Sequence, residues 1–206
     1  MDNLTDIKKR IGDMAQTALA MWRTSHRVFL EHDVDLISEV LSHENKLNDM
    51  EKEITVLLIG YGRACSDARE KHQVTIYADI VGDIELIGDY CKDILERVQI
   101  KIEEKLFFSD EAVSDYEELY RKTESALDEV AVVLQRDNLS IVNDVLKKEE
   151  HLDSLVDAYR ARHDQRLLSG ACSPMAGNMF INMLDFTAAV YYHVKKIARN
   201  LRKIRQ

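Results

Sequence analysis

The near absence of helix-breaking residues is the feature that most constrains the fold of this chain. Across 206 residues there is one proline, Pro174, and there are seven glycines. These two residue types are the least tolerated in a helix interior, so their scarcity favours long helices and argues against an all-β fold. Apolar residues recur at three- and four-residue spacing almost throughout, which predicts amphipathic helices with one buried face each.

Six helices are predicted from this periodicity and from the cap signals between the periodic stretches. Ser109 and Ser173 are expected N-caps, because a serine hydroxyl can accept a hydrogen bond from a free N–H of the first turn. Gly170 is expected to close the fifth helix, since glycine tolerates the left-handed conformation of a helix stop. The expected ranges are Leu4–Glu31, Val34–Ala64, Lys71–Lys105, Ser109–Arg136, Asp137 or Asn138 to Leu168, and Pro174 onward.

The two halves of the chain repeat one another. A shift of 105 residues brings Glu44 onto Glu149 and Leu47 onto Leu152, and a shift of 103 brings Ile87 onto Val190. Helix order and cap positions match as well, and the small change of shift falls in a loop, where insertions are tolerated. The sequence therefore predicts an all-α fold of six long helices. We expect two tandem three-helix bundles, residues 1–106 and 107–206, that arose by internal duplication.

Charge and composition exclude several classes of function. The formal net charge is −9 at pH 7, which disfavours nucleic acid as a partner because phosphates would be repelled. Three cysteines without a CxxC motif fit a reducing cytoplasm and argue against a disulfide framework. The polar N-terminus is not a signal peptide, and the longest apolar run is far shorter than the ~20 residues that span a bilayer. We therefore expect a soluble, cytoplasmic protein.

Basic residues are concentrated on the last helix, although the chain as a whole carries a net negative charge. Two interpretations stay open: favourable charge near a helix C-terminus, or contact with acidic lipid or a membrane partner. These basic residues are Lys195, Lys196, Arg199, Arg202, Lys203 and Arg205.

An acidic column on the third helix is the main candidate site. Glu85, Asp89 and Asp93 stand at i, i+4 and i+8, so they share one helical face. Their mutual repulsion would be removed by a cation, because hard cations take carboxylate oxygens; a solvated acidic face is the alternative. Gly88 lies within this column, and a glycine inside a helix indicates close approach of another helix or a ligand.

The second helix of each repeat carries a matching pair of oxygen ligands one turn apart. In the first repeat these are Glu44 and Asn48, and in the second they are Glu149 and Asp153. Carboxylate and amide oxygens suit hard cations, so these residues complete the candidate ligand set.

These motifs resemble those of the PhoU-like family of phosphate-uptake regulators. That family carries an E/D-x-x-x-D pattern on two helices of each bundle, the later one within a string such as ERIGD. The stretch Glu85–Asp89 matches that string except that Leu86 replaces arginine, and Glu149–Asp153 matches the earlier pattern. The stretch His163–Leu167 is similar to PhoU-like domains attached to sodium/phosphate cotransporters. The resemblance covers essentially the whole chain.

The resemblance implies a non-enzymatic cytoplasmic regulator that docks on a phosphate transporter or a sensor kinase at the membrane and forms a homodimer. It also implies a divalent or iron-type metal ion on the acidic faces. The implied ligands are Glu44, Asn48, Glu85, Asp89, Glu149 and Asp153. Ala188 and Tyr192 stand where the second repeat should repeat the later motif, so we expect at most one good metal site, in the first bundle.

Two other functions remain as alternatives: a metal-binding bundle that acts as a metalloenzyme or metal store, and a plain dimeric scaffold. The seven histidines show no paired ligand spacing, and we expect most of them at the surface or at helix ends. The sequence predicts no catalytic residue and no organic cofactor site.

Overall fold

The computed structural model describes residues 3–138, 142, 146 and 152–204. Within these residues the chain forms six helices and no strand, as the sequence predicts. The helices are α1 (Leu4–Glu31), α2 (Asp35–Ala64), α3 (Ala68–Glu103), α4 (Asp110–Arg136), α6 (Leu152–Leu168) and α7 (Pro174–Ile204).

The helix ends follow the predicted cap chemistry in most places. Ser109 Oγ accepts the N–H of Ala112 at 3.3 Å, and Ser173 Oγ accepts that of Ala176 at 3.2 Å. Gly170 adopts a left-handed φ of 74° just beyond α6, as expected. These bonds satisfy N–H groups that the first turn of a helix cannot pair internally, and they fix where α4 and α7 begin.

Two predicted helix boundaries are corrected by the structure. Helix α3 begins at Ala68 instead of Lys71, because the Asp67 carboxylate accepts the N–H of Glu70 at 2.9 Å. Asp137 does not cap a following helix; it closes α4 in a left-handed conformation with φ 48°. The same short polar residue suits both a helix start and a left-handed helix stop, which is why the sequence could not exclude Asp137 as a cap. The alternative cap, Asn138, stays a prediction, because the three residues that follow it lie outside the described part of the chain.

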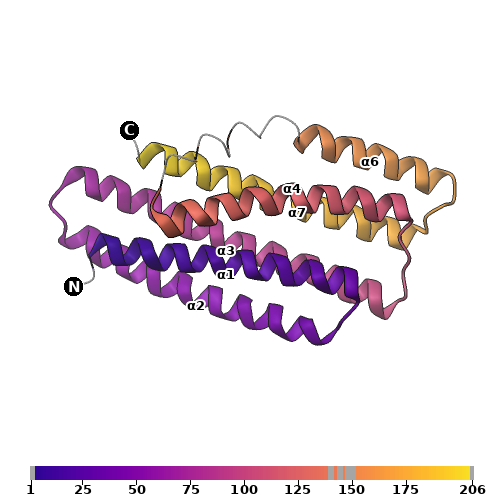
Figure 1. Cartoon of the computed structure of the whole chain (residues 1–206), viewed down its shortest axis with the longest axis horizontal. Coiled ribbons are helices and arrows are strands. Elements are labelled where there is room, and N and C mark those ends of the chain that lie inside the picture. The colour runs from indigo at the N-terminus through magenta and orange to yellow at the C-terminus, as the bar shows by residue number, and fades with distance from the viewer. Residues whose placement is uncertain (1–2, 139–141, 143–145, 147–151, 205–206) are drawn as a thin grey trace.

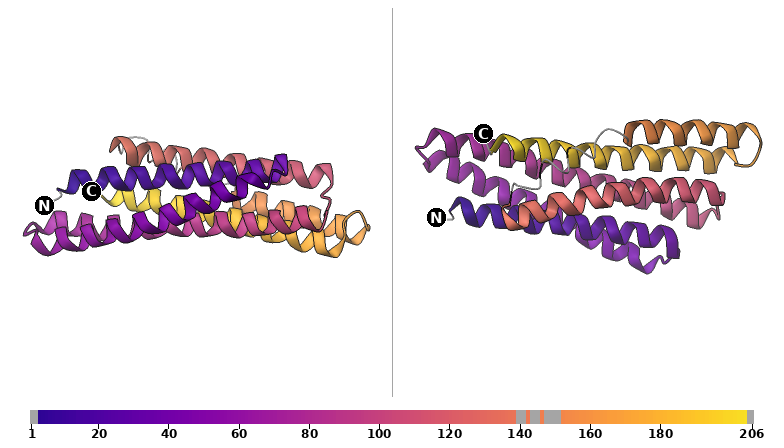
Figure 2. Two further views of the ribbon diagram at one scale, coloured as in Figure 1. Left: turned by 90° about the horizontal axis from the view of Figure 1, so that it is seen from below. Right: turned by 45° about the horizontal axis from the view of Figure 1, so that its top comes forward.

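The six helices lie along one long axis and form an elongated molecule (Figure 1). Helices α1, α2 and α3 pack against one another in the first half, and α4, α6 and α7 do so in the second. The halves join where α3 packs along α7 and α1 packs along α4. The start of α1 and the end of α7 lie at the same end of the molecule (Figure 2).

The buried core is continuous between the halves. Trp22 of α1, Ile87 of α3, Leu127 of α4 and Ile197 of α7 belong to one cluster of buried side chains. Two pairs of positions that the repeat equates, Leu47 with Leu152 and Ile87 with Val190, are buried in both halves. The fold class is therefore confirmed, while the division into units 1–106 and 107–206 stays a prediction.

Gly12 and Gly88 lie at close contacts between helices. A methyl group added to Gly12 would lie 2.9 Å from the Cα of Gln135, so α1 and α4 approach backbone to backbone. A methyl group on Gly88 would overlap the tip of Leu47, which brings α2 close to α3. The expectation that Gly88 marks a close neighbour is confirmed, and that neighbour is a helix. No described helix is long and apolar enough to cross a lipid bilayer.

Candidate functional site

The structure brings together the acidic residues predicted for the first bundle. Burial, and after it the negative charges of Asp89, Glu51 and Glu44, raises the pKa of Glu85. Glu44 and Glu51 lie on α2, while Glu85 and Asp89 lie on α3, so the packing of these two helices forms the cluster. A carboxyl group with a raised pKa is one whose ionised form is disfavoured by its surroundings. A positive charge placed near this face would therefore stabilise the ionised carboxylates.

A lysine already supplies part of that positive charge. Lys92 Nζ lies 3.4 Å from Glu44 Oε1, and Asn48 Nδ2 donates to the same oxygen at 3.0 Å. Glu44 is 8% exposed, so both groups pair with a nearly buried carboxylate. The sequence interpretation paired Glu44 with Asn48 but did not foresee Lys92. Asp93 is the outlying member of the column, with a pKa raised by burial and by Glu96.

The described residues do not present a ready-made metal site. Among them, no three His, Cys, Asp or Glu side chains lie so as to hold a metal ion. One oxygen of Glu44, Oε1, already accepts from the Asn48 amide and the Lys92 ammonium. In the second repeat, Glu149 and the side chain of Asp153 lie outside the described residues. Metal binding therefore stays a prediction.

The corresponding face of α7 carries no acidic pair, in agreement with the sequence. Tyr192 is 55% exposed, and Ala188 packs against the core. Two polar residues of α7 lie close to Ala188 and Tyr192 in sequence, and both contact other helices. Asp185 pairs with Arg160 of α6, and His193 faces α3.

A buried ionic cluster joins the halves where α3 meets α7. Asp83 is 1% exposed, and its Oδ1 lies 2.9 Å from His193 Nδ1 and 2.8 Å from Lys196 Nζ. Lys195 lies over the ring of Tyr191, 4.9 Å from its centroid. At least Lys195 and Lys196, two of the basic residues of the last helix, therefore make contacts within the chain, which the sequence did not reveal.

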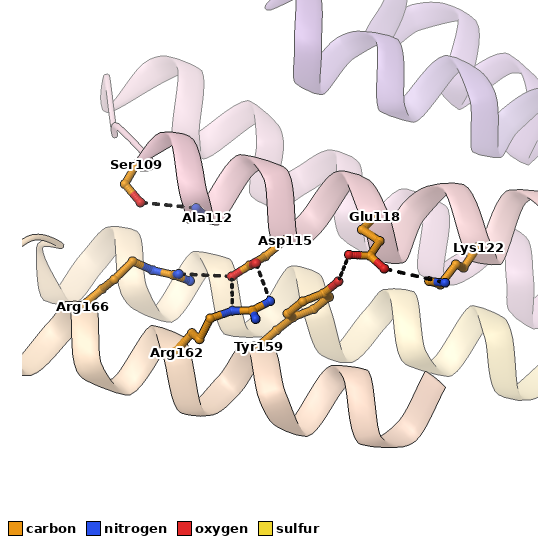
Figure 3. A network of polar contacts seen from close by, with 8 residues as sticks. All are labelled: Ser109, Ala112, Asp115, Glu118, Lys122, Tyr159, Arg162 and Arg166. Atoms are coloured by element: carbon orange, nitrogen blue, oxygen red, sulfur yellow. Dashed lines mark hydrogen bonds and ion pairs between the residues drawn. The ribbon is translucent and has the colours of Figure 1, made fainter. Parts of the chain in front are cut away.

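A second polar cluster, centred on the buried Asp115, fastens α6 to α4 (Figure 3). The Asp115 carboxylate accepts from Arg162 Nη2 at 2.6 Å and from Arg166 Nη1 at 3.1 Å. One turn along, Tyr159 Oη donates to Glu118 at 2.7 Å. Sequence analysis missed this cluster, although a signal was present. Asp115 occupies a position on the apolar stripe of α4, where an acidic residue needs a buried partner.

A cavity of about 790 Å³ lies where α2 ends and α3 begins. At its wall, Glu70 accepts from Tyr61 Oη at 2.7 Å and from Cys65 Sγ at 3.1 Å. The hydrogen bond to Glu70 raises the pKa of Tyr61 to about 12 and also raises that of Cys65. A thiol held in its protonated form is a poor nucleophile, so Cys65 is not activated for covalent chemistry.

Comparison with known proteins identifies the fold that carries these clusters. Residues 11–98 match the family model of the PhoU domain. The chain resembles the PhoU family. A curated relative, the phosphate-specific transport system accessory protein PhoU homolog 1 of Thermotoga maritima, is 26% identical over 93 residues. That match covers 45% of this chain and only 39% of the relative.

Solved PhoU structures extend the likeness to the whole chain. PhoU from Pseudomonas aeruginosa aligns with a TM-score of 0.90 at 15% identity, over 98% of this chain and 96% of that one. The phosphate transport system regulatory protein PhoU from Streptococcus pneumoniae gives 0.86 at 13% identity, over 98% and 95%. A PhoU-like protein from Shewanella oneidensis gives 0.68 at 14% identity, over 98% and 96%. At these identities the likeness shows the fold.

The PhoU-like match contains the candidate site of the first half. Glu44, Asn48, Glu85 and Asp89 all lie within residues 11–98. Glu149 and Asp153 lie beyond the match. The resemblance to the PhoU-like family is thereby confirmed, whereas the similarity to domains attached to cotransporters stays a prediction.

Proposed function

We propose that this PhoU-like chain is a non-enzymatic, cytoplasmic regulator of phosphate uptake and phosphate signalling. It acts by docking on a phosphate transporter or a sensor kinase at the membrane. One observation carries the proposal: a PhoU domain match over residues 11–98 within a whole-chain PhoU fold. The printed names of the relatives point the same way, since one is a transport system accessory protein and another a regulatory protein.

The acidic face of α2 and α3 is the proposed docking surface. A regulator that works by docking needs complementary surface more than reactive groups, and clustered carboxylates attract cationic partners and set their orientation. The raised pKa of Glu85 supports this choice, because a partner's basic group would relieve the repulsion among these carboxylates. Exposed apolar side chains on the same two helices could complete the contact: Leu41, Val56, Ile59 and Leu86.

Two finer parts of the proposal are a homodimer and a metal ion on the same face. The dimer is tested by the solution mass of the purified chain. Metal binding by Glu44, Asn48, Glu85 and Asp89 is tested by elemental analysis of protein purified without chelator. A metal-free and fully folded protein would remove the metal from the proposal and leave docking unchanged.

Docking is tested by recovering partners from phosphate-replete and phosphate-starved cells with a tagged chain. We expect the wild-type chain to retain a phosphate transporter or its sensor kinase, and a variant with Glu85→Ala and Asp89→Ala to lose it. A control with Asp79→Ala and Glu96→Ala removes two exposed charges from the same helix and should retain the partner. Equal recovery by both variants, or no phosphate-related membrane protein with the wild type, would contradict the proposal.

A further inference from the structure

Lys101 is a buried cation for which the described part of the chain provides no acidic partner. It lies in the last turn of α3 and is 8% exposed. Its polar neighbour is His32, whose Nε2 lies 2.8 Å from Lys101 Nζ. The rings of Phe29 and Phe108 flank the ammonium, each with its centroid 5.5 Å away. A buried charge without a counter-ion is costly, so this arrangement has to be compensated.

The titration of both groups reflects this uncompensated positive charge. Burial lowers the pKa of Lys101, with no carboxylate acting against it. Burial and the Lys101 charge lower the pKa of His32 in the same direction. A neutral imidazole can accept from the ammonium, but it supplies no negative charge. An anion that reached both groups would reverse both effects.

A small cavity gives access to this pair. Its volume is about 180 Å³, below the 300–1,000 Å³ typical of drug-sized ligand sites, so it suits a small molecule. Phe107 stands at the cavity and is 87% exposed, although large aromatic side chains are usually covered. Apart from His32 and Lys101, the cavity is lined by Phe29, Leu30, Phe107, Phe108 and Val113.

We propose that this cavity binds a small organic acid, with its carboxylate on Lys101 and His32 and its apolar body against the phenylalanine rings. The walls select against inorganic phosphate, because a dianion would lose its hydration to aromatic surfaces while meeting one ammonium. A carboxylate with an apolar body satisfies the cation and covers Phe107 together. The cavity lies sixteen residues beyond Glu85 on α3, about 24 Å along the helix, so it is separate from the acidic face.

The test measures binding of 3-phenylpropionate to the full chain by calorimetry, beside three comparison ligands. These are the neutral 3-phenylpropanamide, acetate and inorganic phosphate. We expect saturable binding of 3-phenylpropionate, with the other three at least about tenfold weaker. Binding of the amide as tight as that of the acid, or no saturation at millimolar acid, would overturn the proposal.

Two variants place the binding at this cavity. Lys101→Met keeps the length of the side chain without its charge and should weaken binding about 10- to 100-fold. Lys105→Met removes an exposed lysine from the same segment and should leave binding unchanged. If both variants bind like the wild type, the cavity is not the site. Should Lys101→Met fold poorly, NMR titration of the wild-type lysines decides, because bound acid must raise the pKa of Lys101.

Discussion

Replacing Gly12 with alanine tests the contact that joins the two halves along α1 and α4. The added methyl group would lie 2.9 Å from Gln135 Cα and 3.1 Å from the carbonyl oxygen of Leu134. Carbon atoms pack best at about 3.5–4.0 Å, so the two helices would have to separate by roughly 0.6–1 Å. Backbone atoms cannot rotate away as a side-chain tip can. Overpacking of this kind costs about 1–3 kcal/mol, against a gain of about 1 kcal/mol in helix propensity.

We therefore expect Gly12→Ala to lower the free energy of unfolding by about 1 kcal/mol and Tm by about 2–4 °C. Gly82→Ala is the matched control, because Gly82 lies inside α3 with no heavy atom within 4 Å of an added methyl group. It should gain about 1 kcal/mol and raise Tm by a similar amount. Thermal and urea unfolding followed by circular dichroism measure both. A stabilisation by Gly12→Ala equal to that by Gly82→Ala would refute the close contact between α1 and α4.

Three further predictions concern charged and titrating groups. Burial lowers the pKa of His26 from 6.5 to about 4, so its neutral ring contributes its full share of the free energy of unfolding above pH 6.5, and this share is lost as the pH drops toward 4. Allowing for the partial exposure of the ring, acid unfolding should show a loss of about 1–2 kcal/mol. The variant His26→Phe should not show this loss. Asp115→Asn removes the carboxylate that pairs directly with the nearly buried Arg166 and should cost about 3 kcal/mol, with hydrogen exchange accelerated first in α6. Asp128→Asn at an exposed ion pair should cost under about 1 kcal/mol. Glu85→Gln should raise the stability of metal-free protein at neutral pH by a few tenths of a kcal/mol, and a loss of stability would show that its charge is already paired.

Helix positions could be predicted from the sequence because their signals are local. The limits of α1, the serine caps at Ser109 and Ser173 and the left-handed Gly170 each depend on a few neighbouring residues. The cluster of Glu44, Glu85 and Asp89 was predictable for a different reason. The internal repeat and the family resemblance pointed to the same positions on two helices.

The buried ionic contacts could not be predicted, because their partners lie far apart in the chain. Asp83 and His193 are 110 residues apart, and the partners of Asp115 are 47 and 51 residues away. A charged residue on an apolar stripe indicates that a buried partner is needed, but it does not identify that partner. Most histidines were expected at the surface or at helix ends, and His163 and His193 are the two described ones that are buried instead.

The surroundings of Lys101 could not be predicted from the sequence either. Its position after Ile94 and Val98 places it on the buried stripe of α3, which the sequence could have indicated. Its surroundings come from α1 and from the loop before α4, which only the fold brings together.

Phosphate uptake by a deletion strain tests the proposed regulatory role most directly. Labelled phosphate accumulation should change when the gene is removed and return with the wild-type chain. The variant with Glu85→Ala and Asp89→Ala should fail to restore it, while Asp79→Ala with Glu96→Ala should succeed. Uptake and phosphate signalling that stay the same in the deletion strain would contradict the role proposed for this chain.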